Sequence, residues 1–190
     1  MKNLYRLPRS LNVGGKDMAI RTDFRAVLDV LAASRDEELD SFTRVFVLLR
    51  IMYPEWYKIP QEHLEEAIDA ARNFIDSGFR GKKAKRPLMD WQQDASYIIS
   101  AVNKVAGMDV RECENVHWWS FLAWYSEIGE STFSNIVYIR KKLQNGKKLE
   151  KHEREFYESN REIIDIELPE DPEERAIKDD ILAWLNGERS

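Results

Sequence analysis

Residues 116–128 read VHWWSFLAWYSEI, and this stretch decides the fold. In a helical projection its apolar side chains point in nearly every direction, as expected for a segment that is enclosed on most sides. We therefore place this segment at the centre of a mainly α-helical fold. Its large aromatic residues form one cluster: Trp118, Trp119, Phe121, Trp124 and Tyr125. Such residues dominate both cores and interface hot spots. Burial in the core is the favoured interpretation, and any rings left exposed would mark a partner-binding site.

Four more helices are predicted before this segment, because apolar residues recur there at helical spacing. The first follows a cap at Thr22, and the second ends near Tyr53, since Pro54 disfavours helical geometry in the residue before it. The third begins at Pro60 and has Gly78 just beyond its end, and the fourth has a cap at Asp90 and stops at Gly107. Their apolar stripes comprise Phe24, Val27, Leu28, Leu31; Phe42, Val45, Phe46, Leu49, Met52; Leu64, Ala67, Ile68, Ala71, Ile75; and Trp91, Ala95, Ile98, Val102, Val105.

Three further helices are predicted after the aromatic segment. Ser131 begins one that ends at Asn145-Gly146, and residues 148–164 continue as another with few apolar anchors. Two prolines, Pro169 and Pro172, then interrupt the chain before an amphipathic helix. That helix carries Ala176, Ile177, Ile181, Leu182 and Leu185. This pattern divides the chain into a helical domain over 1–145 and a C-terminal helical extension over 146–190.

The only convincing strand signal lies near the N-terminus. Residues 11–13 and 18–20 alternate apolar and polar side chains around Gly14-Gly15-Lys16-Asp17, which predicts a β-hairpin. The expected fold is therefore a helical bundle of about six to eight helices with a small N-terminal β-hairpin.

Composition narrows the function classes. The chain has 190 residues, a net charge of −5 and one cysteine, Cys113, so an intramolecular disulfide is impossible and a reducing cytoplasm fits. No run approaches the roughly 20 apolar residues that cross a bilayer, and no signal peptide is evident, so no membrane association is expected. An acidic chain also makes nucleic acid an unlikely partner in general, and protein partners are favoured.

One segment departs from this acidic character. Residues 80–87 read RGKKAKRP and predict an exposed loop, because its like charges repel and its glycine and proline discourage regular structure. The cations are Arg80, Lys82, Lys83, Lys85 and Arg86. A solvated loop is the favoured interpretation; contact with nucleic acid or with an acidic protein surface stays open.

The residues that could carry chemistry do not combine into a site. Glu114 and His117 have the Glu-x-x-His spacing of di-iron bundles, but a second copy is missing, so His117 is expected to cap or flank the aromatic helix. For Cys113 to act as a nucleophile, the chain would need an oxyanion-hole loop and a third group that orients the base, and neither is evident in the sequence. No P-loop, dinucleotide fingerprint or His-Glu-x-x-His motif is present. We expect no catalytic residues, no metal and no cofactor, and hence a protein that is not an enzyme.

Five runs occur along the chain in this order: MDWQQD at 89–94, IISAVN at 98–103, GMDV at 107–110, HWWSF at 117–121 and IVYIR at 136–140. Together they resemble a phage protein family named after the fifteenth gene product of a phage of Gram-positive bacteria. The firmest part of this resemblance covers roughly residues 88 to 142.

Proteins of that family look like tail-assembly proteins of phages and prophages with long non-contractile tails, where a tail-assembly chaperone is usually encoded. The resemblance implies a chaperone-like protein in the cytoplasm of the bacterial host cell that binds a tail component, the tape-measure or tail tube protein. Self-association into a homo-oligomer is a further option. The alternative hypothesis is a small helical regulatory or nucleic-acid-associated protein that uses the basic loop 80–86.

Overall fold

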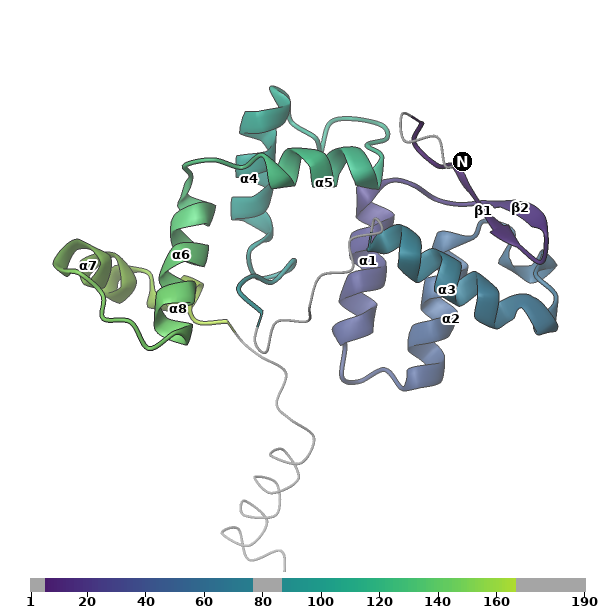
Figure 1. The fold of residues 1–190 in the computed structure, drawn as a ribbon, viewed down its shortest axis with the longest axis horizontal. Helices are drawn as coiled ribbons and strands as arrows, with labels where there is room; N and C mark the ends of the chain where they lie inside the picture. Colours follow the sequence, from purple (N-terminus) through teal and green to yellow (C-terminus); the bar gives the residue numbers. More distant parts are fainter. Residues whose placement is uncertain (1–5, 77–86, 167–190) are drawn as a thin grey trace, which may run out of the picture.

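The computed structural model describes residues 6–76 and 87–166. Within them lie eight α-helices, two short 3-10 helices and one antiparallel two-stranded hairpin (Figure 1). The prediction of a mainly α-helical protein of six to eight helices with an N-terminal hairpin is confirmed. The predicted helix over 176–185 and the basic loop 80–86 lie outside the described residues.

The hairpin consists of β1 (Ser10–Val13) and β2 (Lys16–Ala19), with Val13 opposite Lys16 in the register. Gly14 and Gly15 form the turn with φ of +58° and +76°, a region that favours glycine. The turn also lies against the start of α3 (Leu64–Ile75), because the Gly14 N–H donates to Glu66 Oε2 at 2.9 Å. The hairpin is therefore fixed to the helical body through its turn.

Helices α1 (Phe24–Arg35) and α2 (Ser41–Met52) form an antiparallel pair (Figure 1). Asp23, rather than the predicted Thr22, caps α1, since its carboxylate accepts the Arg25 N–H at 3.0 Å. A carboxylate is a strong N-cap acceptor. Helix α2 ends before Tyr53, as predicted. The 3-10 turns η1 (Trp56–Lys58) and η2 (Gln61–His63) then lead into α3.

Helix α4 (Ala95–Ala106) begins later than the sequence suggests. The predicted cap Asp90 accepts the N–H groups of Gln92 and Gln93, both at 2.8 Å, and so stabilises a turn that precedes the helix. Asp94 takes the position before the first helical residue. The predicted end at Gly107 is confirmed, with φ of +71°.

The remaining helices are α5 (Trp118–Ser126), α6 (Thr132–Gln144), α7 (Lys151–Ser159) and α8 (Arg161–Ile164). Ser131 caps α6 in a reciprocal capping box with Ser134, which confirms the predicted start. The single helix predicted over 148–164 is instead two, because the backbone leaves helical geometry at Asn160 with φ of −132°.

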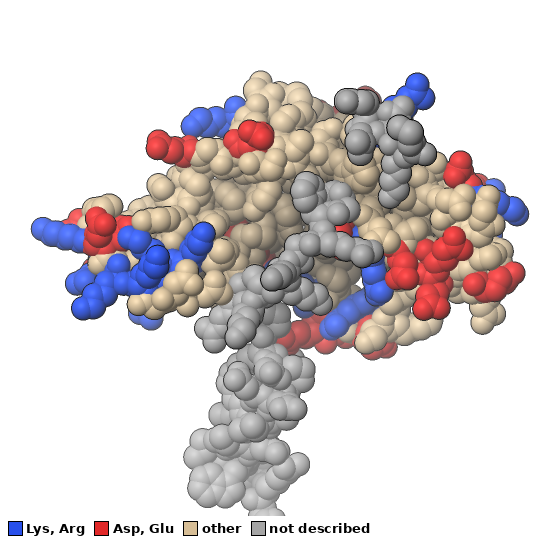
Figure 2. Space-filling view, in the orientation of Figure 1, with Lys and Arg blue, Asp and Glu red and all other residues tan. Residues whose placement is uncertain are grey.

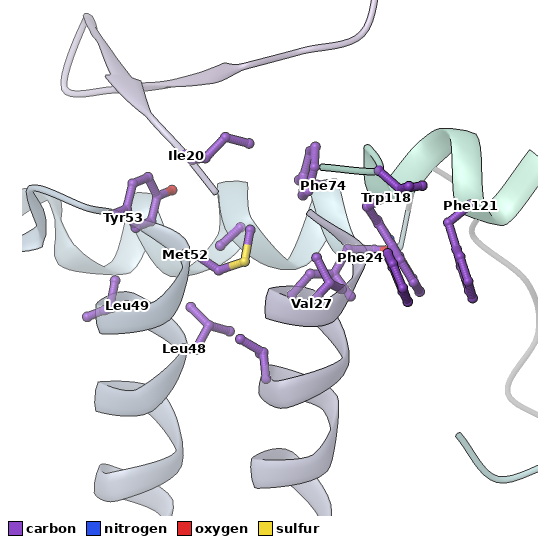
Figure 3. Close-up of a cluster of buried hydrophobic side chains, with 14 of the residues drawn as sticks. Ile20, Phe24, Val27, Leu48, Leu49, Met52, Tyr53, Phe74, Trp118 and Phe121 are labelled. Carbon is purple, nitrogen blue, oxygen red and sulfur yellow. The ribbon is translucent and has the colours of Figure 1, made fainter. Parts of the chain in front are cut away.

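The hairpin and helices α1 to α5 share one hydrophobic core (Figure 3). Tyr53, Met52 and Val27 are fully buried there, and Tyr53 Oη donates to the Ala67 carbonyl at 2.8 Å. A second, smaller core of Ile136, Ile139 and Ile164 joins α6 to α8. The division of the chain at residue 145 stays a prediction, since residues 167–190 lie outside the described part.

Candidate partner-binding surface

The aromatic cluster of α5 is divided between core and surface. Trp118 and Phe121 are 2% and 0% exposed, and Phe121 stacks on Phe24 with ring centroids 4.5 Å apart (Figure 3). Trp118 Nε1 donates to the Ile75 carbonyl at 2.7 Å. These two rings therefore belong to the core, as the favoured interpretation expected.

The other three rings of the cluster, Trp119, Trp124 and Tyr125, are half-buried. Trp119 Nε1 donates to the Phe74 carbonyl at 2.9 Å, which fixes this ring against the end of α3. Ala123 and Ser126 are the exposed residues of this helix, and its other seven residues are buried or half-buried. The segment is therefore enclosed on most sides, as expected. A partner-binding role for the half-buried rings stays a prediction.

His117 positions α5, as its expected capping role required. Its Nδ1 accepts the Trp119 N–H at 3.1 Å, and its Nε2 lies 2.9 Å from the Pro8 carbonyl oxygen. This geometry needs the neutral imidazole with its proton on Nε2, since a protonated Nδ1 cannot accept. Burial lowers the pKa of His117 below its usual 6.5, while the Pro8 carbonyl opposes that shift. The start of α5 is therefore held by the neutral form of the His117 ring.

A buried ion pair connects the two cores. Arg140 of α6 donates from Nη1 and Nη2 to the two carboxylate oxygens of Asp94 at 2.6 and 2.9 Å, and the two side chains are 5% and 0% exposed. Arg140 also donates to the carbonyls of Leu88, Ile163 and Ile164 at 3.2, 2.7 and 2.6 Å. A fork of five N–H donors suits such a set of acceptors. The pair thus holds the start of α4, α6 and α8 together.

The exposed aromatic surface lies elsewhere, along α2 and η1. We call Phe42, Phe46, Trp56 and Tyr57 the aromatic row. Their ring centroids follow one another at 6.4, 5.2 and 6.5 Å. Phe42 is 77% exposed and Tyr57 is 66% exposed, and the two rings between them are half-buried. The row is therefore a continuous aromatic strip with both ends in solvent.

The sequence placed Phe42 in the buried stripe of its helix, and that prediction was wrong. Phe42 does share a helix face with Leu49 and Met52, which are buried. However, Phe42 lies in the first turn of α2, at the end of the α1–α2 pair that extends beyond α3 (Figure 1). The spacing of apolar residues identifies which face of a helix is apolar, but it does not show how far along the helix that face is covered by neighbouring elements. Sequence reasoning therefore missed the most exposed ring of the row, and with it the row as a surface feature.

The other residues singled out by the sequence form no further site in the described part. Glu114 is exposed and His117 is occupied by the contacts above. Cys113 is half-exposed, with Sγ 3.7 Å from the Asp109 carbonyl. Over residues 6–76 and 87–166, no group of three or more His, Cys, Asp and Glu side chains is arranged to hold a metal ion. Arg80, Lys82, Lys83, Lys85 and Arg86 lie outside the described residues.

Comparison with family models gives a match over residues 4–166, to the model described as Bacteriophage Gp15 protein. The chain belongs to the bacteriophage Gp15 protein family. The matched region of this Gp15 family member extends well beyond residues 88–142, where the sequence resemblance is firmest. It contains the hairpin, both cores, the Asp94–Arg140 pair and the aromatic row. Neither a search of curated proteins nor a search of solved structures finds a match.

Of the helices described between residues 6 and 166, none is both long and apolar enough to cross a bilayer.

Proposed function

We propose that this phage protein binds a tail component, the tape-measure or tail tube protein, through its aromatic row during tail morphogenesis. Two points support the proposal. The family match identifies a phage protein, and the resemblance drawn from the sequence implies a place among tail-assembly factors. The observation that carries the choice of surface is the strip formed by Phe42, Phe46, Trp56 and Tyr57, which has large rings facing solvent at both ends.

The physical basis is the unused hydrophobic surface of these rings. Phe42 and Tyr57 are exposed, whereas Trp118 and Phe121 of the same protein are buried by the fold. Burying apolar area against a partner is favourable, and tyrosine and tryptophan are enriched among the residues that dominate binding energy. Aromatic rings also lose little side-chain entropy on binding, because they have only two rotatable side-chain torsions. A rigid row on helical elements is therefore a suitable anchor for another protein.

The proposed action is passive and takes place in the bacterial cytoplasm before the tail is complete. By covering an apolar segment of the tape-measure or tube protein, the row would restrain premature self-association of that segment. Release during assembly would follow when a partner in the tail competes for the same segment. The protein acts here as a binding protein and rearranges no bonds.

The experiment is co-expression of the tagged chain with the tape-measure protein, and separately with the tail tube protein, encoded by the same phage or prophage. The expected result is that one of them is retained with the tagged chain and gains solubility. The double variant Phe42→Ala/Tyr57→Ala should lose this retention. Tyr138→Ala is the matched control, since Tyr138 is an exposed ring, 50% accessible, on α6. Failure to retain either partner, or equal retention by both variants, would refute the proposal.

A further inference from the structure

A groove lies between the end of α6 and α7, at the end of the molecule farthest from the hairpin (Figure 1). Three partly exposed apolar side chains, Leu143, Leu149 and Tyr157, line it, and its volume is about 530 Å³. Lys147, Arg154 and Arg161 provide its charged lining, with Glu158 as the single carboxylate among the lining residues. This α6–α7 groove is therefore lined by both apolar side chains and cations.

The surroundings of the groove are basic as well. Residues 141–154 contain six lysines and arginines but only two glutamates. Figure 2 shows the blue side chains gathered over this end of the molecule, whereas red side chains dominate the region of α2 and α3. Within the described residues, neither Lys147 nor Arg154 forms an ion pair, although Arg161 contacts Asp165 at 3.2 Å. The two free cations are thus available to an acidic ligand.

A second hollow beside this groove lies at the point where the described chain ends. That hollow, of about 250 Å³, is lined by Leu88, Arg140, Ile164 and Ile166 among others, and also by Leu143. Leu143 is shared by the two hollows. The described chain therefore ends at Ile166, in a hollow that shares Leu143 with the α6–α7 groove.

The sequence that follows has the complementary chemistry. Residues 167–174 read ELPEDPEE, with five carboxylates, no cation and three apolar residues. Two prolines disfavour a helix and favour an extended backbone. Eight extended residues span up to about 26 Å. We propose that residues 167–174 bind in the α6–α7 groove of their own chain.

Both the covalent connection and the amino-acid composition favour residues 167–174 as the ligand of the α6–α7 groove. A segment tethered close to its site within the same chain has an effective concentration in the millimolar range, so weak ion pairs suffice to hold it. The basic segment 80–86 could also attract carboxylates, but it contains no large apolar side chain to match Leu168 and the prolines. Binding would neutralise the basic end of the protein. The inference is independent of the aromatic row.

The first test is limited cleavage of the full chain by a protease specific for glutamate, with the initial rate measured within residues 167–174. Lys147→Glu/Arg154→Glu should speed cleavage there about three- to tenfold, as expected when two screened ion pairs of a tethered segment are lost. Adding 0.5 M salt to the unchanged protein should act in the same direction. The matched control is Arg9→Glu/Lys16→Glu, which reverses two exposed cations on and beside the hairpin. Equal cleavage rates in all three proteins would overturn the proposal.

The second test is carbodiimide cross-linking of an equal mixture of unlabelled and ¹⁵N-labelled protein, read by mass spectrometry. The expected products join carboxylates of 167–174 to Lys147, Lys148 or Lys151, with both peptides from the same isotopic chain. Cross-links mainly to Lys82, Lys83 or Lys85 would place the segment on the basic loop and overturn the proposal. Mixed-isotope products would show that the groove binds this segment of a second copy. Absence of cross-links from residues 167–174 would show that the segment is not bound. Both results contradict the proposal.

Discussion

Replacing Arg140 with alanine should strongly destabilise the fold. The Asp94 side chain is fully buried, and its carboxylate accepts two hydrogen bonds from the Arg140 guanidinium, at 2.6 and 2.9 Å. In Arg140→Ala the carboxylate stays buried without its counter-charge, and three carbonyls lose a charged donor. Breaking a buried pair in this way costs about 3–5 kcal/mol. Because domains are stable by only about 5–15 kcal/mol, this loss is a large part of the total.

Urea unfolding followed by far-UV circular dichroism at 25 °C would measure the change. Arg140→Lys should fall between alanine and the unchanged protein, since an ammonium keeps the charge but cannot bind both carboxylate oxygens in a planar fork. Asp94→Ala/Arg140→Ala should cost less than the sum of the single changes, because the double variant leaves no unpaired charge. Arg161→Ala, at the exposed pair with Asp165, is the control and should leave stability nearly unchanged. A loss below about 1 kcal/mol in Arg140→Ala would refute the assigned role of the pair.

Three further predictions follow from local geometry. Because burial lowers the pKa of His117, its neutral form stabilises the fold above pH 6.5, and this contribution is lost as the pH falls through the lowered pKa. Between pH 7.5 and 5.5 the melting temperature of the unchanged protein should therefore fall more steeply than that of His117→Asn. Parallel curves for the two proteins would contradict this prediction. Gly14→Ala should destabilise the protein more than Gly15→Ala, since a Cβ at Gly14 would lie 2.5 Å from His63 Cδ2, whereas a Cβ at Gly15 meets nothing within 4 Å. Equal losses of unfolding free energy in urea would show that the His63 contact does not decide the difference. Phe42→Ala/Tyr57→Ala should leave the urea midpoint almost unchanged, because both rings are exposed; a large shift would make the aromatic row a structural element.

Much of the fold was predictable because its signals are local. The alternation around Gly14-Gly15 fixes the hairpin, and Ser131 and Gly107 mark helix ends through hydrogen bonds or backbone angles within a few residues. The errors at Thr22 and Asp90 are of the same local kind. At α1 the neighbouring Asp23 takes the cap, whereas at α4 the Asp90 carboxylate stabilises a turn that ends before the helix begins, and the sequence alone does not distinguish these outcomes.

The Asp94–Arg140 pair shows what local signals cannot supply. Asp94 ends one of the runs that carry the family resemblance and Arg140 ends another, 46 residues later. Nothing in either run shows that the two side chains meet, because that depends on how α4 and α6 pack. The aromatic row is a similar case, since Phe46 and Trp56 come together only through the turn after α2. The surface proposed here for binding could be found only once the packing was known.

The affinity of the purified chain for whichever tail protein it retains tests the central claim most directly. Isothermal titration calorimetry should show that Phe42→Ala/Tyr57→Ala binds at least about 30-fold more weakly than the unchanged chain, the equivalent of about 2 kcal/mol. Tyr138→Ala should bind within about twofold of it, the change expected for an exposed ring outside the contact. If the double variant binds as tightly as the Tyr138→Ala control, the aromatic row is not the partner-binding surface.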